Sequence, residues 1–126
     1  VDLQQKTFQG GIKTAAGKGR IVPIHPKILP FVQAWAQHGH KYLITADGKK
    51  LSKQKYYECW AEVMDRIGAD KTPHEARHTF ETSLDNAKAN RKCIDLLMGH
   101  KSKDVGNRVY NHKTIEQLRE TILLLE

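Results

Sequence analysis

The sequence Thr72-Pro73-His74-Glu75-Ala76-Arg77-His78 opens the stretch of the chain that decides its fold. The same stretch passes through Met98-Gly99-His100 and ends at Val109-Tyr110-Asn111-His112. Thr72 and Glu75 have the spacing of a capping box, and Pro73 stands at the first helical position, where no amide hydrogen is needed. A helix is therefore predicted to begin at Pro73.

His74 and Arg77 lie three positions apart, so their side chains point about 60° from each other around this helix. An arginine presents a planar fork of donors that fits two phosphate oxygens, and it keeps its charge at neutral pH. The start of a helix adds positive potential that also favours an anion. The pair is a candidate phosphate-binding site, although a surface histidine and a salt-bridging arginine have the same spacing.

Gly99 is predicted to end a short helix over 91–98, and His100 then begins a loop in which its ring can point away from the core. Tyr110 follows ten positions later. A tyrosine has an unperturbed pKa of about 10, so only about one molecule in a thousand is phenolate at pH 7. About 4 kcal/mol of help must therefore come from neighbouring cations or a base. Singly, His100 reads as a loop residue and Tyr110 as a core side chain, but together with His74 and Arg77 they can bind a phosphate and attack it.

Outside this stretch the pattern is a hairpin followed by helices. Residues 6–12 and 20–24 are predicted to be antiparallel strands around a glycine-rich turn, with Pro23 confining the second strand to an edge or marking a strand end. Helices are expected near 30–38, 53–67, 73–87, 91–98, 103–110 and 115–125. The predicted fold class is α+β and mostly α-helical, a small antiparallel β-hairpin followed by about five to six helices. At 126 residues, 1–126 is expected to be a single domain.

The composition favours a polyanionic partner. The chain has 21 Lys and Arg against 14 Asp and Glu, a formal charge of +7, and cations that neutralise phosphates release condensed counterions. Ribosomal and membrane-surface proteins share this bias. No apolar run approaches a membrane span, Val1 begins no signal-peptide pattern, and Cys59 and Cys93 lack metal-ligand spacing. We expect a cytoplasmic protein with reduced cysteines and no membrane partner.

Several elements in order resemble one family. His74-Glu75-Ala76-Arg77-His78-Thr79-Phe80 resembles the His-x-x-Arg-His-Thr-Phe segment of the tyrosine recombinases, the phage-integrase family. Met98-Gly99-His100 resembles the Leu-Gly-His element of this family, Tyr110 has the spacing of its nucleophile, and His112 completes a Tyr-x-His ending. Lys13-Thr14, the glycine-rich turn and Arg20-Ile21-Val22-Pro23 resemble the hairpin that carries its catalytic lysine. The resemblance spans Lys13 to about Leu125.

The resemblance implies a mechanism and its residues. Tyr110 would attack the scissile phosphate and form a 3′-phosphotyrosyl link, while Arg77 would bind the non-bridging oxygens. His74 and His100 would hydrogen-bond the phosphate and manage protons, and Lys13 would protonate the departing 5′-oxygen. No cofactor and no metal would be needed. The partners would be double-stranded DNA and other protomers on that DNA, with the protein nucleoid-associated when bound.

The resemblance also implies an incomplete catalytic set. The family has a further arginine before the hairpin and an acidic residue shortly after that arginine, and both are expected to lie before Val1. The fold would then be the C-terminal part of a DNA breaking-rejoining enzyme-like catalytic domain, truncated at its N-terminus and inactive or nearly so alone. Lys18 competes with Lys13 for the lysine role. The apolar helix near 115–125 is expected to pack either on its own domain or into a neighbouring protomer.

Three functions compete at this point. The first is a site-specific recombinase, integrase-like and carried by a prophage or other mobile element rather than a chromosome-dimer resolvase. The second is a basic helical DNA-binding module without catalysis, which would not need Tyr110 at this spacing. The third is a metal-dependent nuclease, since His74 and His78 have the i, i+4 spacing of a helical ligand pair. No acidic or cysteine ligand set accompanies that pair.

Overall fold

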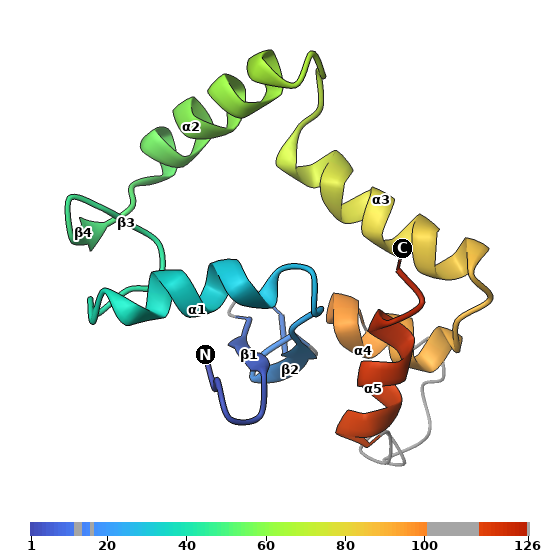
Figure 1. The fold of residues 1–126 in the computed structure, drawn as a ribbon. Helices are drawn as coiled ribbons and strands as arrows, with labels where there is room; N and C mark the ends of the chain where they lie inside the picture. The colour runs from blue at the N-terminus through green and yellow to red at the C-terminus, as the bar shows by residue number, and fades with distance from the viewer. Residues whose placement is uncertain (12–13, 16, 101–113, 126) are drawn as a thin grey trace. The chain divides into compact units, whose positions relative to one another are not determined.

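The computed structural model describes residues 1–11, 14–15, 17–100 and 114–125. It divides the chain into two compact units. The first unit combines Val1–Leu29 with Glu81–Glu126, and the second is Pro30–Phe80. Figure 1 shows the elements of both. The single domain predicted over 1–126 stays a prediction.

The first unit contains the predicted hairpin. Strand β1 (Thr7–Gly10) pairs antiparallel with β2 (Arg20–Pro23), and the register places Thr7 opposite Pro23 and Gly10 opposite Arg20. Both strands are shorter than the sequence pattern predicted. Pro23 ends β2, where its missing amide hydrogen leaves no gap in the ladder. At its other end the ladder stops at Gly10 and Arg20, between which the chain forms the glycine-rich turn.

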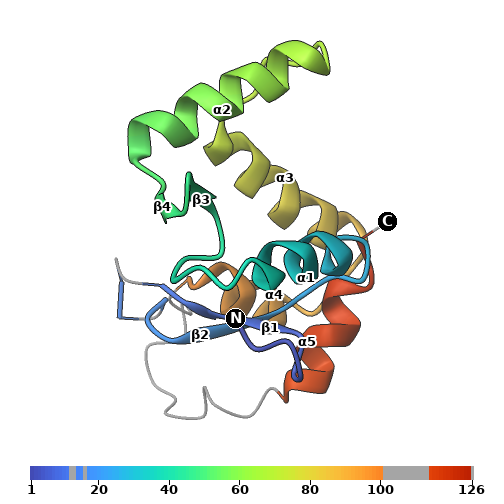
Figure 2. The ribbon, with the colours of Figure 1, turned by 60° about the vertical axis from the view of Figure 1, so that its left-hand side comes forward.

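Two helices of the first unit pack against β2. They are α4 (Arg91–Met98) and α5 (Ile115–Ile122), which contact each other as well as the strand (Figures 1 and 2). The side chains they bury are mostly aliphatic, and the final turns of α3 add one more. The buried hydrophobic residues of this unit are Ile24, Leu84, Cys93, Ile94, Leu97, Met98, Leu118 and Ile122. This apolar cluster is the core on which the end of α4 rests.

Helix α5 packs on its own unit, the first of the two arrangements expected for it. Arg119 Nη2 donates to the Gln5 carbonyl at 2.5 Å, and His25 Nε2 lies 3.1 Å from the Leu125 carbonyl oxygen. Leu118 and Ile122 face the core, whereas Leu123 and Leu124 are 57% and 45% exposed. The apolar surplus of this helix thus lies in the residues just beyond its last turn.

The second unit contains most of α1 (Leu29–Gln37), a two-residue hairpin of β3 (Thr45–Ala46) and β4 (Lys49–Lys50), and helix α2 (Lys53–Arg66). Asp47 and Gly48 form the hairpin turn with φ of 51° and 74°, the positive values that such a tight turn requires. Ser52 caps α2 by accepting from the Lys55 amide at 3.1 Å. Trp60 Nε1 donates to the Lys71 carbonyl at 2.5 Å, which attaches α2 to the segment before α3 (Pro73–Asn86).

The predicted fold class is confirmed: the described residues form two small antiparallel sheets and five helices, and the fold is α+β and mostly helical. One of the six predicted helices, that near 103–110, lies outside the described residues. Among the helices that the structure describes, none combines the length and apolar composition needed to cross a membrane.

Candidate active site

The helix that carries His74 and Arg77 begins with the predicted capping box. Thr72 Oγ1 accepts from the Glu75 amide at 3.2 Å, and Glu75 Oε2 accepts from the Thr72 amide at 2.8 Å. The Thr72 hydroxyl also donates to Glu75 Oε2, at 3.0 Å, and the hydrogen bonds from the Thr72 amide and then from this hydroxyl hold the pKa of Glu75 below its ordinary value. Glu75 is therefore committed to the helix start as a carboxylate, which leaves His74 and Arg77 as the candidates for phosphate contact on this turn.

His74 pairs with His78 one turn further along the helix. Their Nε2 atoms lie 3.0 Å apart, and the rings meet edge to face with centroids 4.5 Å apart. One ring must donate and the other accept, so a single proton lies between the two nitrogens. Sequence analysis named His78 in the family segment and as half of a possible ligand pair. The structure adds that it can share a proton with His74.

The turn that carries His100 is built at the end of α4. Asn90 caps the start of the helix, accepting from the Lys92 and Cys93 amides at 3.0 and 3.4 Å. Gly99 ends it with a φ of 68°, and the His100 amide donates to the Asp95 carbonyl at 2.9 Å. A glycine adopts this left-handed backbone without steric cost. The backbone of His100 is thus held in a closed helix end beside the buried Leu97 and Met98.

The glycine-rich turn of the β1–β2 hairpin lies against this helix end. Arg20 Nη1 donates to the Met98 carbonyl at 3.2 Å, across 78 positions of sequence. A Cβ on Gly99 would lie 2.6 Å from Arg20 Nη1 and 2.9 Å from the Gly17 Cα. Only a residue without a side chain lets the hairpin approach so closely. The structure therefore brings together two predicted elements, the hairpin loop and the His100 turn.

This close approach gives a stability prediction. Gly99→Ala is expected to destabilise the protein more than Gly19→Ala, although both glycines have a φ near 70°. The left-handed backbone costs an alanine roughly 1–2 kcal/mol at either position. At Gly99 the new methyl group also displaces Arg20, whereas nothing lies within 4 Å of a Cβ on Gly19. Losing the Arg20 hydrogen bond adds about 1 kcal/mol.

Urea unfolding of both variants measures the difference in the free energy of unfolding. Gly19→Ala is the matched control, because it carries the backbone cost without the collision. Equal losses in the two variants would mean that the hairpin does not contact the His100 turn in solution.

An ion-pair cluster between α3 and α4 also reaches His100. Arg91 contacts the carboxylates of Glu81, Asp85 and Asp95 at 2.6, 3.0 and 3.0 Å. The hydrogen bond that Arg91 donates to Glu81 is the main cause that raises the pKa of Arg91 above its ordinary value. Glu81 Oε1, the oxygen that meets Arg91, lies 3.9 Å from His100 Nδ1. Sequence analysis missed Glu81 and Arg91, and the acidic residues at 81, 85 and 95 around one arginine were the available signal.

The structure thus places the predicted residues in three groups. His74 and Arg77 lie on one helix in the second unit, and His100 lies in the first unit beside the hairpin turn. Lys13 and Tyr110 lie outside the described residues, as does His112. Lys18, the competitor of Lys13, is exposed in the hairpin turn. Within the described part of the chain, no group of three or more His, Cys, Asp or Glu side chains could hold a metal ion.

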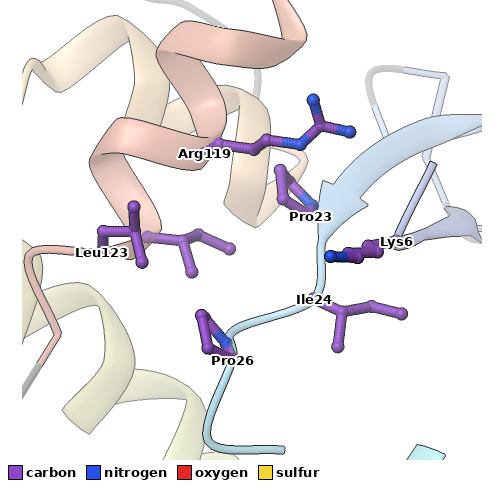
Figure 3. Close-up of a pocket in the computed structure, with 7 residues that line it drawn as sticks. Lys6, Pro23, Ile24, Pro26, Arg119 and Leu123 are labelled. Atoms are coloured by element: carbon purple, nitrogen blue, oxygen red, sulfur yellow. The ribbon is translucent and has the colours of Figure 1, made fainter. Parts of the chain in front are cut away.

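A separate cavity of about 120 Å³ lies between α5 and the segment that follows β2 (Figure 3). Ile24, Pro23 and Pro26 line one side, and Arg119 of α5 and Leu123 just beyond this helix line the other. Pockets for small organic ligands are usually about 300–1,000 Å³. This cavity is too small for such a ligand, and none of the predicted site residues lines it.

Known proteins resemble this sequence over most of the chain. The chain is 24% identical over 134 residues to the tyrosine recombinase XerD of Yersinia pestis, covering 94% of this chain and 44% of that protein. It is 30% identical over 110 residues to the tyrosine recombinase XerA of Thermococcus onnurineus, covering 82% of this chain and 39% of that protein. The chain therefore spans less than half the length of these relatives. No solved structure matches it significantly.

A family model also matches nearly the whole chain. Residues 1–117 match the phage integrase family, a range that includes the hairpin, the His74–Arg77 helix, the His100 turn and Tyr110. The relatives and the family model agree with the resemblance seen in the sequence motifs. The chain belongs to the phage integrase family.

Proposed function

We propose that this chain carries the catalytic residues of a site-specific DNA recombinase, which cuts and rejoins double-stranded DNA through a 3′-phosphotyrosyl intermediate. The observation that carries the proposal is the contact of the hairpin with the His100 turn, through Arg20 and Met98 and through Gly17 and Gly99. Two elements of one catalytic motif, far apart in sequence, are adjacent in the first unit. Family membership over residues 1–117 supports the same assignment.

Each proposed role follows from the chemistry of the side chain. Arg77 pairs with the two non-bridging phosphate oxygens through its planar fork of donors, and the start of α3 adds positive potential. His74 and His100 hydrogen-bond the phosphate and hold the proton that Tyr110 must lose. A positioned acid at the leaving oxygen, the role proposed for Lys13, is worth roughly 10²–10⁴ in rate.

The covalent link determines what the enzyme needs. When Tyr110 replaces the 5′-oxygen on phosphorus, one phosphoester is exchanged for another, so the 5′-hydroxyl of a second strand can reverse the step without ATP. The cations at the phosphate are side chains of the protein, and the mechanism uses no cofactor. Exchange of strands requires further protomers on the same DNA, and the formal charge of +7 suits binding to that polyanion. An integrase of a mobile element is the finer form of this proposal.

A denaturing gel tests the proposal. The full-length protein is incubated with a nicked suicide duplex that carries the cognate site, and a covalent protein–DNA adduct is expected. Its protein side should be a phosphotyrosine bond, stable to hydroxylamine and located on the peptide that contains Tyr110. DNA binding without any adduct would favour the non-catalytic DNA-binding module instead.

The proposed mechanism predicts that adduct formation is insensitive to metal chelators. Adduct formation is expected to proceed at an unchanged rate in excess EDTA, because Arg77, His74 and His100 supply the positive charge and the proton transfer. The measurement compares initial rates with and without EDTA on one substrate preparation. Inhibition that added Mg²⁺, Mn²⁺ or Zn²⁺ reverses would instead favour the metal-dependent nuclease, with His74 and His78 as ligands.

A further inference from the structure

We propose that Glu81 is a positioning residue for His100, held in place by Arg91, and that it sets which ring nitrogen of His100 faces the substrate. The inference rests on the proposed function, in which His100 hydrogen-bonds the scissile phosphate. It deepens that function by adding two residues outside the motif.

The first step is that the Glu81 carboxylate is itself fixed. Its Oε1 accepts from Arg91 Nη2 at 2.6 Å, and its side chain is only 19% exposed. Arg91 Nη1 in turn donates to both carboxylate oxygens of Asp85, at 3.0 and 3.2 Å, and Arg91 also pairs with Asp95. Asp85 stands on α3 and Asp95 on α4, so the guanidinium is held from both helices. These contacts of Arg91 leave Glu81 Oε1 little freedom to move.

The second step concerns the ring of His100. Its Nδ1 faces the same Oε1 at 3.9 Å, an ion-pair distance longer than a direct hydrogen bond. A carboxylate only accepts, so the favoured histidine form has its proton on Nδ1. The other nitrogen, Nε2, then points away from Glu81. In the neutral ring Nε2 is the acceptor, and it is the nitrogen placed to take up a proton and then donate to a phosphate oxygen.

The third step is the backbone. The His100 amide is held by the Asp95 carbonyl at 2.9 Å, and the preceding Met98 carbonyl by Arg20 at 3.2 Å. A fixed backbone and one fixed partner at Nδ1 leave the ring few other orientations. Arg91 has a second effect, because it balances the charge of Glu81. Without it, a carboxylate this close to His100 would repel the phosphate that His100 is proposed to bind.

The first test measures, without DNA, which ring nitrogen of His100 carries the proton. In full-length protein labelled with ¹⁵N-histidine, ring nitrogen shifts show which nitrogen of neutral His100 carries the proton, and a His100→Gln variant identifies the signal. The Nδ1–H form is expected in the unchanged protein. Glu81→Ala is expected to convert it to the Nε2–H form or a mixture. Glu81→Gln keeps the size, removes the charge and serves as second variant if the alanine variant does not fold.

The matched control is Glu116→Gln, which removes a carboxylate of the same unit that pairs with Arg119 at 3.7 Å and lies outside the Glu81–Arg91 network. It is expected to leave the His100 signals unchanged. A His100 ring already in the Nε2–H form in the unchanged protein, or unaltered by both Glu81 variants, would overturn the inference. An equal shift in Glu116→Gln would overturn it too, because the effect would then follow from the loss of any carboxylate in this unit and not from Glu81.

The adduct assay then measures how Glu81 affects the rate of the reaction. Glu81→Ala is expected to slow adduct formation by roughly ten- to hundredfold, since misplacing a catalytic group by about 1 Å can cost about 10²-fold. DNA binding should stay unchanged. The rate of Glu116→Gln should stay close to that of the unchanged protein. Absence of adduct from the unchanged protein would instead defeat the proposed function, and the nitrogen shifts would still decide whether Glu81 orients His100.

Discussion

Tyr110→Phe is expected to abolish covalent attachment of the protein to DNA while leaving DNA binding nearly unchanged. Phenylalanine keeps the ring and its packing, and it removes only the oxygen that attacks phosphorus. No other group in the proposed site can form the same bond, so the loss should be complete rather than partial. The measurement is the adduct band on a denaturing gel, beside a filter-binding or mobility-shift assay with the same duplex.

Tyr42→Phe is the matched control for Tyr110→Phe. It makes the same chemical change at a half-exposed tyrosine of the second unit, outside every motif named above. Its adduct should form at the rate of the unchanged protein. A full-strength adduct from Tyr110→Phe would remove Tyr110 from the mechanism and leave the nucleophile to another side chain.

The elements that sequence predicted best are those in which both partners lie within one turn of chain. The predicted capping box of Thr72 with Glu75 is confirmed by its hydrogen bonds, and Thr114 forms a second one with Gln117. Three positions separate the partners in each case, so their meeting depends on the local backbone alone. The left-handed Gly99 at the end of α4 was predictable for the same reason.

The elements that sequence could not predict depend on packing between distant segments. Arg20 was read as a strand residue, and nothing local indicated that its guanidinium would meet the Met98 carbonyl. Arg91 was predicted to be the first residue of a helix, whereas the structure shows it forming ion pairs with carboxylates of two helices. Such contacts require the angle between α3 and α4, which hydrophobic periodicity does not contain.

The roles of His74, Arg77, His100, Lys13 and Tyr110 were derived from motif resemblance, and they stay predictions. What the structure adds is the support around His100. Of these residues, His100 has a turn, a hairpin and an ion-pair cluster that the structure describes around it. The functional proposal can therefore be tested most specifically at Glu81. The largest effects are expected at Tyr110, which is proposed to form the covalent bond, and at Arg77, which is proposed to balance the charge of the phosphate.

Arg77 is the second of these residues, and Arg77→Ala is expected to slow adduct formation by roughly 10²–10³-fold, the usual cost of removing one preorganised donor from a transition state. Arg77→Lys should recover only part of the rate, since a lysine keeps the charge but cannot pair with two oxygens at once. The matched control is Arg66→Ala, which also lowers the formal charge from +7 to +6 but removes a 74% exposed side chain paired with Glu62. It should weaken DNA binding slightly and leave the rate on saturating DNA unchanged.

A substrate with a neutral methylphosphonate at the scissile position separates charge from structure. One non-bridging oxygen is then a methyl group, so there is less charge for Arg77 to balance. Most of the Arg77→Ala defect should disappear on that substrate if the arginine acts on the phosphoryl oxygens. The defect should persist in full if the variant merely disturbs the helix. In that second case Arg77 would be a structural residue of α3, and the phosphate would need a different cation.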